Sequence, residues 1–224
     1  MTRLKRGRRA ILTVARLTLA VLAVFTGIGC GALHVVPSSA QPPKAGSNSV
    51  LIRQPFEEVW SRAIPQIGKS FFVINNIDKS SGILNVSYTG DPEKYVDCGT
   101  IHSEFGNQTT DFPASKANEQ WVGPSGGILA ANYTQHVTLD GRMNIVFERV
   151  LSDSTRVTVN ARYVLTRKVV ALVGSNPPVA TEDEASFNSG GEANLGKSVC
   201  MPNGKFESEA LAIISPASTD SSTR

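Results

Sequence analysis

The segment TRVTVNARYVLT, residues 155–166, alternates apolar and polar side chains over most of its length. A period of two is typical of a β-strand that has one face on the core and the other in water. One face is apolar and the other is mostly polar; the apolar set is Val157, Val159, Ala161, Tyr163 and Leu165. We therefore expect a half-buried antiparallel sheet around this segment.

Two similar segments precede this one in the chain. Tyr133–Leu139 and Met143–Val150 are rich in β-forming residues and are separated by Asp140-Gly141. The dipeptide Asp-Gly between two alternating segments is typical of a tight hairpin turn. A second turn is expected at residues 152–154, so the three segments predict an antiparallel meander.

A helix is expected in the first half of the chain. Pro55 suits the first turn of a helix, and Glu57 and Glu58 suit the positive end of its dipole. One face of a helix repeats at every third or fourth residue, and the apolar residues after Pro55 have this spacing. They predict a single stripe that faces the core. The stripe consists of Phe56, Val59, Trp60, Ala63, Ile64 and Ile67.

Three more strands are expected at residues 71–77, 83–88 and 95–103, the first two as a hairpin because a turn-forming sequence separates them. Residues 104–127 and 175–197 are polar and contain Gly and Pro. Unstructured loops of this length are uncommon inside a domain and are either functional or mobile. We predict that both segments are long loops.

The expected order of elements is a strand at residues 50–53, a helix, several antiparallel strands and a closing helix at 205–214. This order collects the helices on one side of an antiparallel sheet, which is the α+β arrangement. We predict one α+β domain over residues 50–214, with the antiparallel sheet wrapped on the helices in a helix-grip-like fold. Residues 215–224 are polar and predict a disordered tail.

The N-terminal residues have the pattern of an export signal. Residues 1–9, MTRLKRGRR, are basic, and Leu17–Gly29 is an apolar or weakly polar run of the length of a signal-peptide core. The run ends in Gly27-Ile28-Gly29-Cys30, which resembles the lipobox of bacterial lipoproteins. The resemblance implies that residues 1–29 are a lipoprotein signal peptide and that Cys30 is lipidated.

The resemblance also implies a cellular location. Gly31 is not the Asp with which lipoproteins are retained at the inner membrane, so the periplasmic face of the outer membrane is expected. Two alternatives stay open: cleavage after Ser38-Ser39-Ala40 would give a soluble periplasmic protein, and an uncleaved segment would anchor the chain in the inner membrane. Residues 30–49 are rich in Pro, Ser and Gly, and predict a flexible tether after the lipidated cysteine.

The charge of the exported part excludes one class of partner. Six of the 22 Lys and Arg residues precede Cys30, which leaves 16 basic residues against 19 acidic ones. A slightly acidic domain lacks the basic surface that binds the phosphates of nucleic acid. We therefore expect no binding to nucleic acid.

Besides Cys30, the chain contains Cys98 and Cys200. A pair of cysteines in an oxidising compartment predicts a structural disulfide. The alternative is that Cys98 is a nucleophile with His102 as its base, although on one strand these residues would lie about 13 Å apart. Catalysis would also need a low thiol pKa and a group that orients the histidine, and the sequence indicates neither.

The opening of the domain resembles small helix-grip domains of bacterial envelope lipoproteins, similar to the C component of the outer-membrane β-barrel assembly machine. The residues that carry the resemblance are Pro55–Trp60, the strand at 71–77 and Ser81-Gly82 before the next strand. The chain is also similar to uncharacterised proteobacterial lipoproteins with a Tyr-Val-Asp-Cys-Gly segment, here Tyr95–Gly99. The resemblance implies no catalytic residues.

The candidate functional residues favour a non-enzymatic envelope lipoprotein. The histidines have no ligand-spaced neighbours, so no metal site or cofactor is predicted. Phe112 and Trp121 lie in an expected loop and are candidate contacts with an envelope protein partner in an outer-membrane or periplasmic assembly. The alternative for these two residues is that they fold back onto the core.

The alternative to docking or scaffolding is a binding module. The groove between helix and sheet could bind a hydrophobic or cell-wall-derived ligand, because the inner face of the sheet supplies apolar lining. If Phe56, Trp60 and Phe147 fill that groove, no ligand can occupy it. An enzyme of unfamiliar type is the third and least favoured interpretation.

Overall fold

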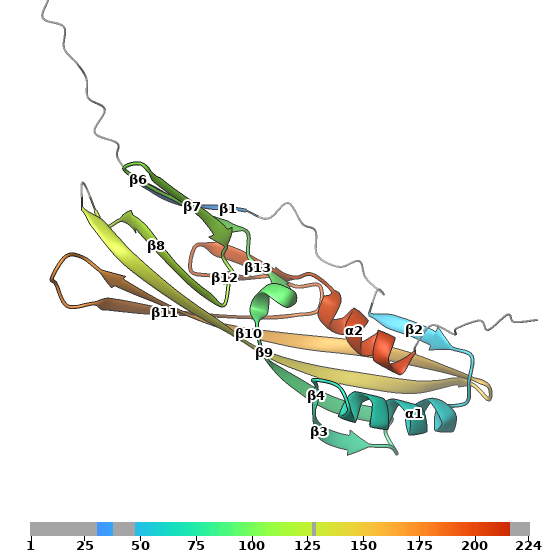
Figure 1. The fold of residues 1–224 in the computed structure, drawn as a ribbon. Helices are drawn as coiled ribbons and strands as arrows, with labels where there is room; N and C mark the ends of the chain where they lie inside the picture. Colours follow the sequence, from blue (N-terminus) through green and yellow to red (C-terminus); the bar gives the residue numbers. More distant parts are fainter. Residues whose placement is uncertain (1–30, 38–47, 127–128, 216–224) are drawn as a thin grey trace, which may run out of the picture.

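Two long antiparallel strands form the spine of the molecule (Figure 1). The computed structural model describes residues 31–37, 48–126 and 129–215. Strands β9 (Ala130–Leu151) and β10 (Ser154–Leu172) pair along almost their whole length. The alternating apolar residues of β10 are all buried, which confirms the half-buried strand predicted from its period.

Shorter strands extend the spine on both sides into a seven-stranded sheet. β4 (Ile83–Gly90) and β8 (Asn118–Pro124) pair with successive parts of β9. β2 (Ser49–Ile52) and β11 (Val179–Asn188) pair with successive parts of β10. β3 (Val73–Asp78) pairs with β4 in the predicted hairpin and forms one edge of the sheet.

Two helices cover one half of this sheet, α1 (Phe56–Gly68) and α2 (Lys205–Ile214) (Figure 1). The predicted stripe of α1 is confirmed, because its buried residues are Phe56, Val59, Trp60, Ala63 and Ile67.

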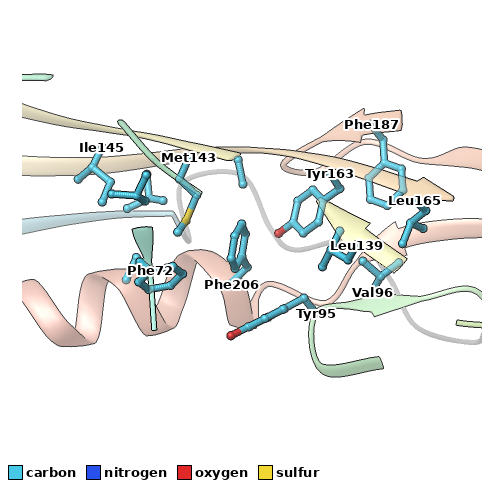
Figure 2. Close-up of a cluster of buried hydrophobic side chains, with 14 of the residues drawn as sticks. Phe72, Tyr95, Val96, Leu139, Met143, Ile145, Tyr163, Leu165, Phe187 and Phe206 are labelled. Atoms are coloured by element: carbon cyan, nitrogen blue, oxygen red, sulfur yellow. The ribbon is translucent and has the colours of Figure 1, made fainter. Parts of the chain in front are cut away.

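Aromatic rings fill the space between α2 and the sheet (Figure 2). The ring of Phe206 lies 4.8 Å from that of Tyr95, 5.5 Å from that of Tyr163 and 5.6 Å from that of Phe72. Tilted and edge-on rings at such distances add to the stabilisation that burial provides. This cluster fixes the start of α2 on the centre of the spine.

A three-stranded sheet covers the other half of the spine (Figure 1). It consists of β1 (Ala32–Val36), β6 (Thr100–Phe105) and β7 (Gln108–Pro113), in the order β1-β6-β7. The hydroxyl of Ser103 in β6 donates a hydrogen bond to the carbonyl of Val122 in β8, at 3.1 Å. The two sheets are therefore joined by polar contacts as well as by apolar packing.

A small third sheet lies where the two halves meet. β12 (Ala193–Leu195) pairs with β13 (Ser198–Pro202), and β13 pairs with β5 (Val96–Asp97). A short 3-10 helix, η1 (Pro92–Lys94), precedes β5. The third sheet thus joins the middle of the chain to the strand that leads into α2.

The predicted α+β helix-grip fold is wrong. About 60% of the described residues are in strands and 15% are helical, in several antiparallel sheets. The main cause is that both predicted loops are largely strands: residues 104–127 contain all of β7 and β8, and residues 175–197 contain β11 and β12. In β7 only Phe112 is fully buried, and in β11 only Ala185 and Phe187 are, so their sequences lack the apolar alternation that predicts a strand.

The predicted hairpin turn at Asp140-Gly141 is also wrong, because β9 continues through both residues. Gly141 lies under the ring of Phe206, and a β-carbon on Gly141 would lie 2.7 Å from Cζ of that ring. The glycine is therefore needed for the close approach of α2 to the sheet, and not for a turn.

The N-terminal predictions fall mostly outside the described residues. Residues 1–29, Cys30 and residues 216–224 lie outside them, as does most of the predicted tether. Within the tether, however, Ala32–Val36 form β1, because their backbone pairs with β6 from Ala32↔Glu104 to Val36↔Thr100. In the parts of the chain described, neither helix is long and apolar enough to cross a membrane.

Candidate ligand-binding site

The predicted disulfide between Cys98 and Cys200 is present. Cys98 directly follows β5, and Cys200 lies in β13, opposite the end of β5. Both cysteines are buried. Because its sulfur is bonded to Cys200, Cys98 is not a free thiol, so the alternative in which it acts as a nucleophile is excluded.

His102 contacts two carboxylates and is not paired with Cys98. Its Nδ1 lies 2.6 Å from the Asp111 carboxylate in β7, and its Nε2 lies 3.0 Å from the Glu104 carboxylate. The hydrogen bond to Asp111, which has the larger effect, and the hydrogen bond to Glu104 raise the pKa of His102 above its ordinary value. The cluster links neighbouring strands at the surface, and no metal-binding group of His, Cys, Asp or Glu occurs among the described residues.

The groove between α1 and the sheet is filled by aromatic side chains. The ring of Trp60 lies 5.6 Å from that of Phe56 and 5.0 Å from that of Phe147. All three residues are at most 5% exposed. This packing excludes the predicted position of a ligand between helix and sheet.

A cavity of about 340 Å³ lies at the other half of the molecule, between the β1-β6-β7 sheet and the seven-stranded sheet. This volume is within the range of small-molecule sites. One wall comes from β1 and β6, and the opposite wall comes from β8, β9, β10 and β11. The apolar and aromatic lining residues are Leu33, Val35, Ile101, Trp121, Tyr133 and Val169.

Phe112 and Trp121 pack inside this half of the molecule instead of forming a contact surface. Phe112 is 3% exposed and Trp121 is 7% exposed. The ring of Trp121 lies 4.9 Å from that of Phe112 and stacks on that of Tyr133 at 5.0 Å. The prediction of an exposed interface is therefore corrected in favour of its alternative, because β7, paired with β6, and β8, paired with β9, turn both rings inward.

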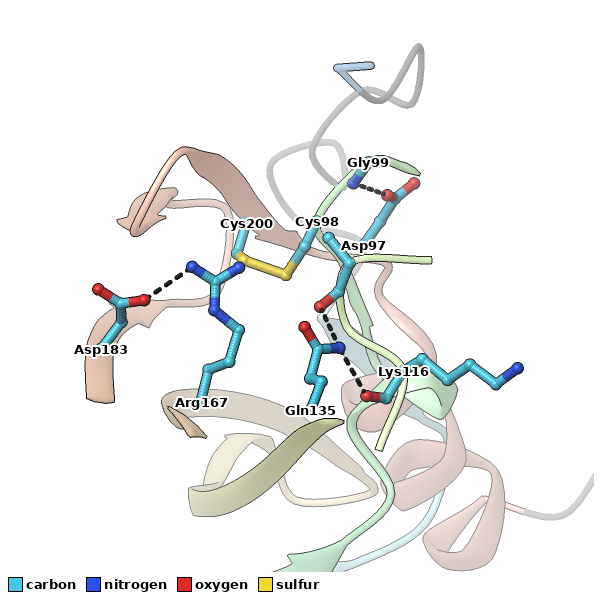
Figure 3. The surroundings of a disulfide bond; sticks show 9 residues. Asp97, Cys98, Gly99, Lys116, Gln135, Arg167, Asp183 and Cys200 are labelled. Carbon is cyan, nitrogen blue, oxygen red and sulfur yellow. Dashed lines mark hydrogen bonds and ion pairs between the residues drawn. A yellow bond between two sulfur atoms is a disulfide. The ribbon is translucent and has the colours of Figure 1, made fainter. Parts of the chain in front are cut away.

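Gln135 in β9 is a fully buried polar residue in the wall of the cavity. Its Nε2 donates hydrogen bonds to the backbone carbonyls of Lys116, at 3.1 Å, and Ala114, at 3.4 Å (Figure 3). Its Oε1 is buried and accepts no hydrogen bond from any described residue. The amide is therefore oriented by the protein, with its acceptor left unused.

Arg167 in β10 is the second polar residue of this wall and is 9% exposed. Its Nη2 donates to Oδ2 of Asp183, directly opposite in β11, at 2.7 Å. Gly196, in the turn between β12 and β13, packs on this pair, since a β-carbon there would overlap Nη2 of Arg167. Nε of Arg167 is buried and has no described acceptor.

Buried polar atoms without partners are concentrated at this cavity. Six such side-chain atoms occur among the described residues, and three of them are on residues that line the cavity: Trp121 Nε1, Gln135 Oε1 and Arg167 Nε. A buried polar atom without a partner costs free energy, and most such atoms in proteins are satisfied. An apolar cavity with a few unsatisfied polar groups is what a small-molecule site requires.

The sequence contained a signal for two of these residues. Arg167 continues the buried set of β10 two positions beyond Leu165, and Gln135 lies two positions before the buried Val137 of β9. A polar residue at an inward position of an alternating strand indicates a site. The signal for Arg167 was missed because the predicted strand ended at Thr166.

Comparisons of the chain with protein-family models, with curated proteins and with solved structures give no match. The resemblance to envelope lipoproteins therefore stays a prediction. Function has to be inferred from the geometry of the cavity.

Proposed function

We propose that this protein is a non-enzymatic binding protein of the bacterial envelope, which holds a small ligand with an apolar body in the cavity between its two sheets. The observation that carries the proposal is the concentration of unsatisfied buried polar atoms on residues that line a mostly apolar cavity of about 340 Å³. The apolar wall would bury the body of the ligand, and the polar atoms would fix its orientation.

The rigidity of the cavity walls supports this proposal. The floor is formed by four adjacent paired strands, and the disulfide lies beside the side chains of Gln135 and Arg167 (Figure 3). A site that is formed before the ligand arrives loses less conformational entropy on binding.

We further propose that Cys30 is lipidated and holds the protein at the periplasmic face of the outer membrane. Only Gly31 separates Cys30 from β1, which lines the cavity through Leu33 and Val35. Gly31 itself packs on the end of β6, since a β-carbon there would lie 2.8 Å from the ring of Phe105. A lipid on Cys30 would therefore keep the cavity close to the bilayer, from which an apolar ligand could enter.

The anchor is tested by the intact mass of the full chain extracted from its own membranes. A mature chain that begins at Cys30 and carries acyl groups supports the proposal, and Cys30→Ser should abolish the added mass. A chain that begins at Met1, or a cleaved chain without acyl groups, contradicts it.

Ligand binding is tested with the fluorescent probe anilinonaphthalene sulfonate on the same full-length material. Thr181 lines the cavity, whereas the neighbouring Ala180 points to the opposite face of β11. Thr181→Phe should weaken probe binding at least about tenfold, or 1.4 kcal/mol, because it narrows the cavity. Ala180→Phe is the matched control, and equal effects of both substitutions would contradict the proposal.

Docking on an envelope assembly is the second candidate, and the edge strand β3 favours it. Val73 is 60% exposed and Ile77 is 47% exposed on this open edge of the sheet. Exposed apolar edges are templates for strand addition by a partner protein. Val73→Lys with Ile77→Lys should abolish crosslinking to a stoichiometric partner, while Val199→Lys, elsewhere on the surface, should not.

A further inference from the structure

The three cavity residues with unsatisfied polar atoms form one diagonal row across the neighbouring strands β8, β9 and β10, and the partner of Arg167 extends it to β11. Trp121 in β8 pairs with Tyr133, two residues before Gln135 in β9. Gln135 pairs with Val169, two residues after Arg167 in β10, and Arg167 pairs with Asp183 in β11. Residues that are offset by two positions on paired strands share a face and are within reach of long side chains.

This row separates the cavity from the packed core of the sheet. On one side of it lie Val137 and Leu165, which are 1% and 0% exposed and belong to the core. On the other side lie Tyr133 and Val169, which line the cavity toward the ends of the hairpins. The polar row is therefore the deep end of the cavity.

The unused groups of the row have a defined hydrogen-bonding character. Trp121 Nε1 and Arg167 Nε can only donate, so both require an acceptor, while Gln135 Oε1 can only accept. Arg167 and Lys197 bring two positive charges to the lining against the single carboxylate of Asp183. An oxyanion supplies acceptors for both donors, and its negative charge fits the excess of positive charge.

On the basis of the proposed function, we infer that the ligand is an amphiphile that binds with its head first. Its anionic, oxygen-bearing head group accepts from the two unused donors of the row, Trp121 Nε1 and Arg167 Nε. Its aliphatic chain lies against Leu33, Val35 and Val169. A carboxylate head with an alkyl chain is the simplest molecule of this class.

The inference is tested by calorimetric titration of the full-length, membrane-extracted protein with octanoate, octanol and octylamine, which share one alkyl chain. Octanoate should bind about tenfold or more tightly than the other two. Its two charged oxygens can accept from both buried donors, whereas octanol is neutral with a single oxygen and the ammonium group of octylamine cannot accept. Equal binding of the three probes, or tightest binding of octylamine, would overturn the head-group inference and leave the proposed function intact. If none of the three probes bound, both the proposed function and this inference would fail.

A conservative substitution isolates the role of Arg167. Arg167→Lys keeps the charge opposite Asp183 but removes Nε and the planar guanidinium. The preference for octanoate over octanol should fall to about threefold or less, since a hydrogen bond to a charged group is lost. Lys168→Arg, on the outer face of the same strand, should leave the preference unchanged, and an unchanged preference in Arg167→Lys would overturn the inference.

Discussion

The hydroxyl of Tyr163 in β10 donates a hydrogen bond to the buried carboxylate of Glu207 in α2, at 2.8 Å. Ser189, which follows β11, donates to the other oxygen of the same carboxylate at 2.6 Å. Burial, together with the neighbouring Glu207 carboxylate, raises the pKa of Tyr163 well above its ordinary range. The carboxylate thus joins the first turn of α2 to two strands of the sheet.

Tyr163→Phe should lower the free energy of unfolding by about 1–3 kcal/mol, because it leaves a buried carboxylate oxygen without its donor. Denaturant unfolding at neutral pH measures the change. The matched control is Tyr88→Phe, since the Tyr88 ring also packs near Phe206 but its hydroxyl donates to no described residue. Equal losses in both variants would contradict a specific role for the Tyr163 hydroxyl.

Gly141→Ala should destabilise the protein by about 1–3 kcal/mol, because the new β-carbon would overlap the ring of Phe206. A double-mutant cycle with Phe206→Leu measures the coupling by denaturant unfolding. The smaller side chain should relieve the overlap, so the effect of the glycine substitution should shrink in that background. Additive losses would show that the ring does not set the need for glycine.

Cys98→Ala with Cys200→Ala should lower the free energy of unfolding by about 2–5 kcal/mol, because the bond closes a long loop and restricts the unfolded chain. The two cysteines are 102 residues apart in the sequence. Reduction of the wild-type protein should produce a similar loss, measured by denaturant unfolding with and without reductant. A reduced protein as stable as the oxidised one would contradict the prediction.

His102 should make stability depend on pH near neutrality. Its carboxylate neighbours Asp111 and Glu104 raise its pKa above the ordinary value of about 6.5, so the folded state holds the proton more tightly than the unfolded state. The stabilisation is therefore fully present below about pH 6.5 and is lost as pH rises through the raised pKa of the folded state. The ring of His34 in β1, 4.8 Å from that of His102, is the other histidine at this position.

Urea unfolding across this pH range measures the effect. His102→Gln should remove the dependence on pH, because its side chain does not titrate. His136→Gln, at a histidine that faces Asn118 on the outer side of β9, is the control and should retain it. A wild-type stability that is constant across the range would contradict the assignment.

Local sequence patterns were enough to predict a helix or a strand where one face of that element is apolar. The stripe of α1 and the alternation of β10 each predicted the correct element, because burial of one face requires that spacing. Strands β7 and β11 were missed because they are held by backbone pairing along their lengths, which leaves little trace in side-chain type. The long β9 was split in two at Gly141, because a glycine that admits a neighbouring ring looks the same in sequence as one that forms a turn.

The candidate site shows the same division. The pairing of Cys98 and Cys200 follows from their number and the expected compartment and is confirmed, whereas the lipidated Cys30 stays a prediction from the resemblance of Gly27–Cys30 to a lipobox. The sequence could not predict that Trp121, Gln135 and Arg167 lie together. Each lies on a different strand, and only the registers of β8, β9 and β10 bring them into one row. The sequence by itself determined which faces are apolar and which cysteines pair. The tertiary structure alone decided which polar residues are buried together, because strand register depends on the turns and on how the apolar faces of distant strands pack against one another.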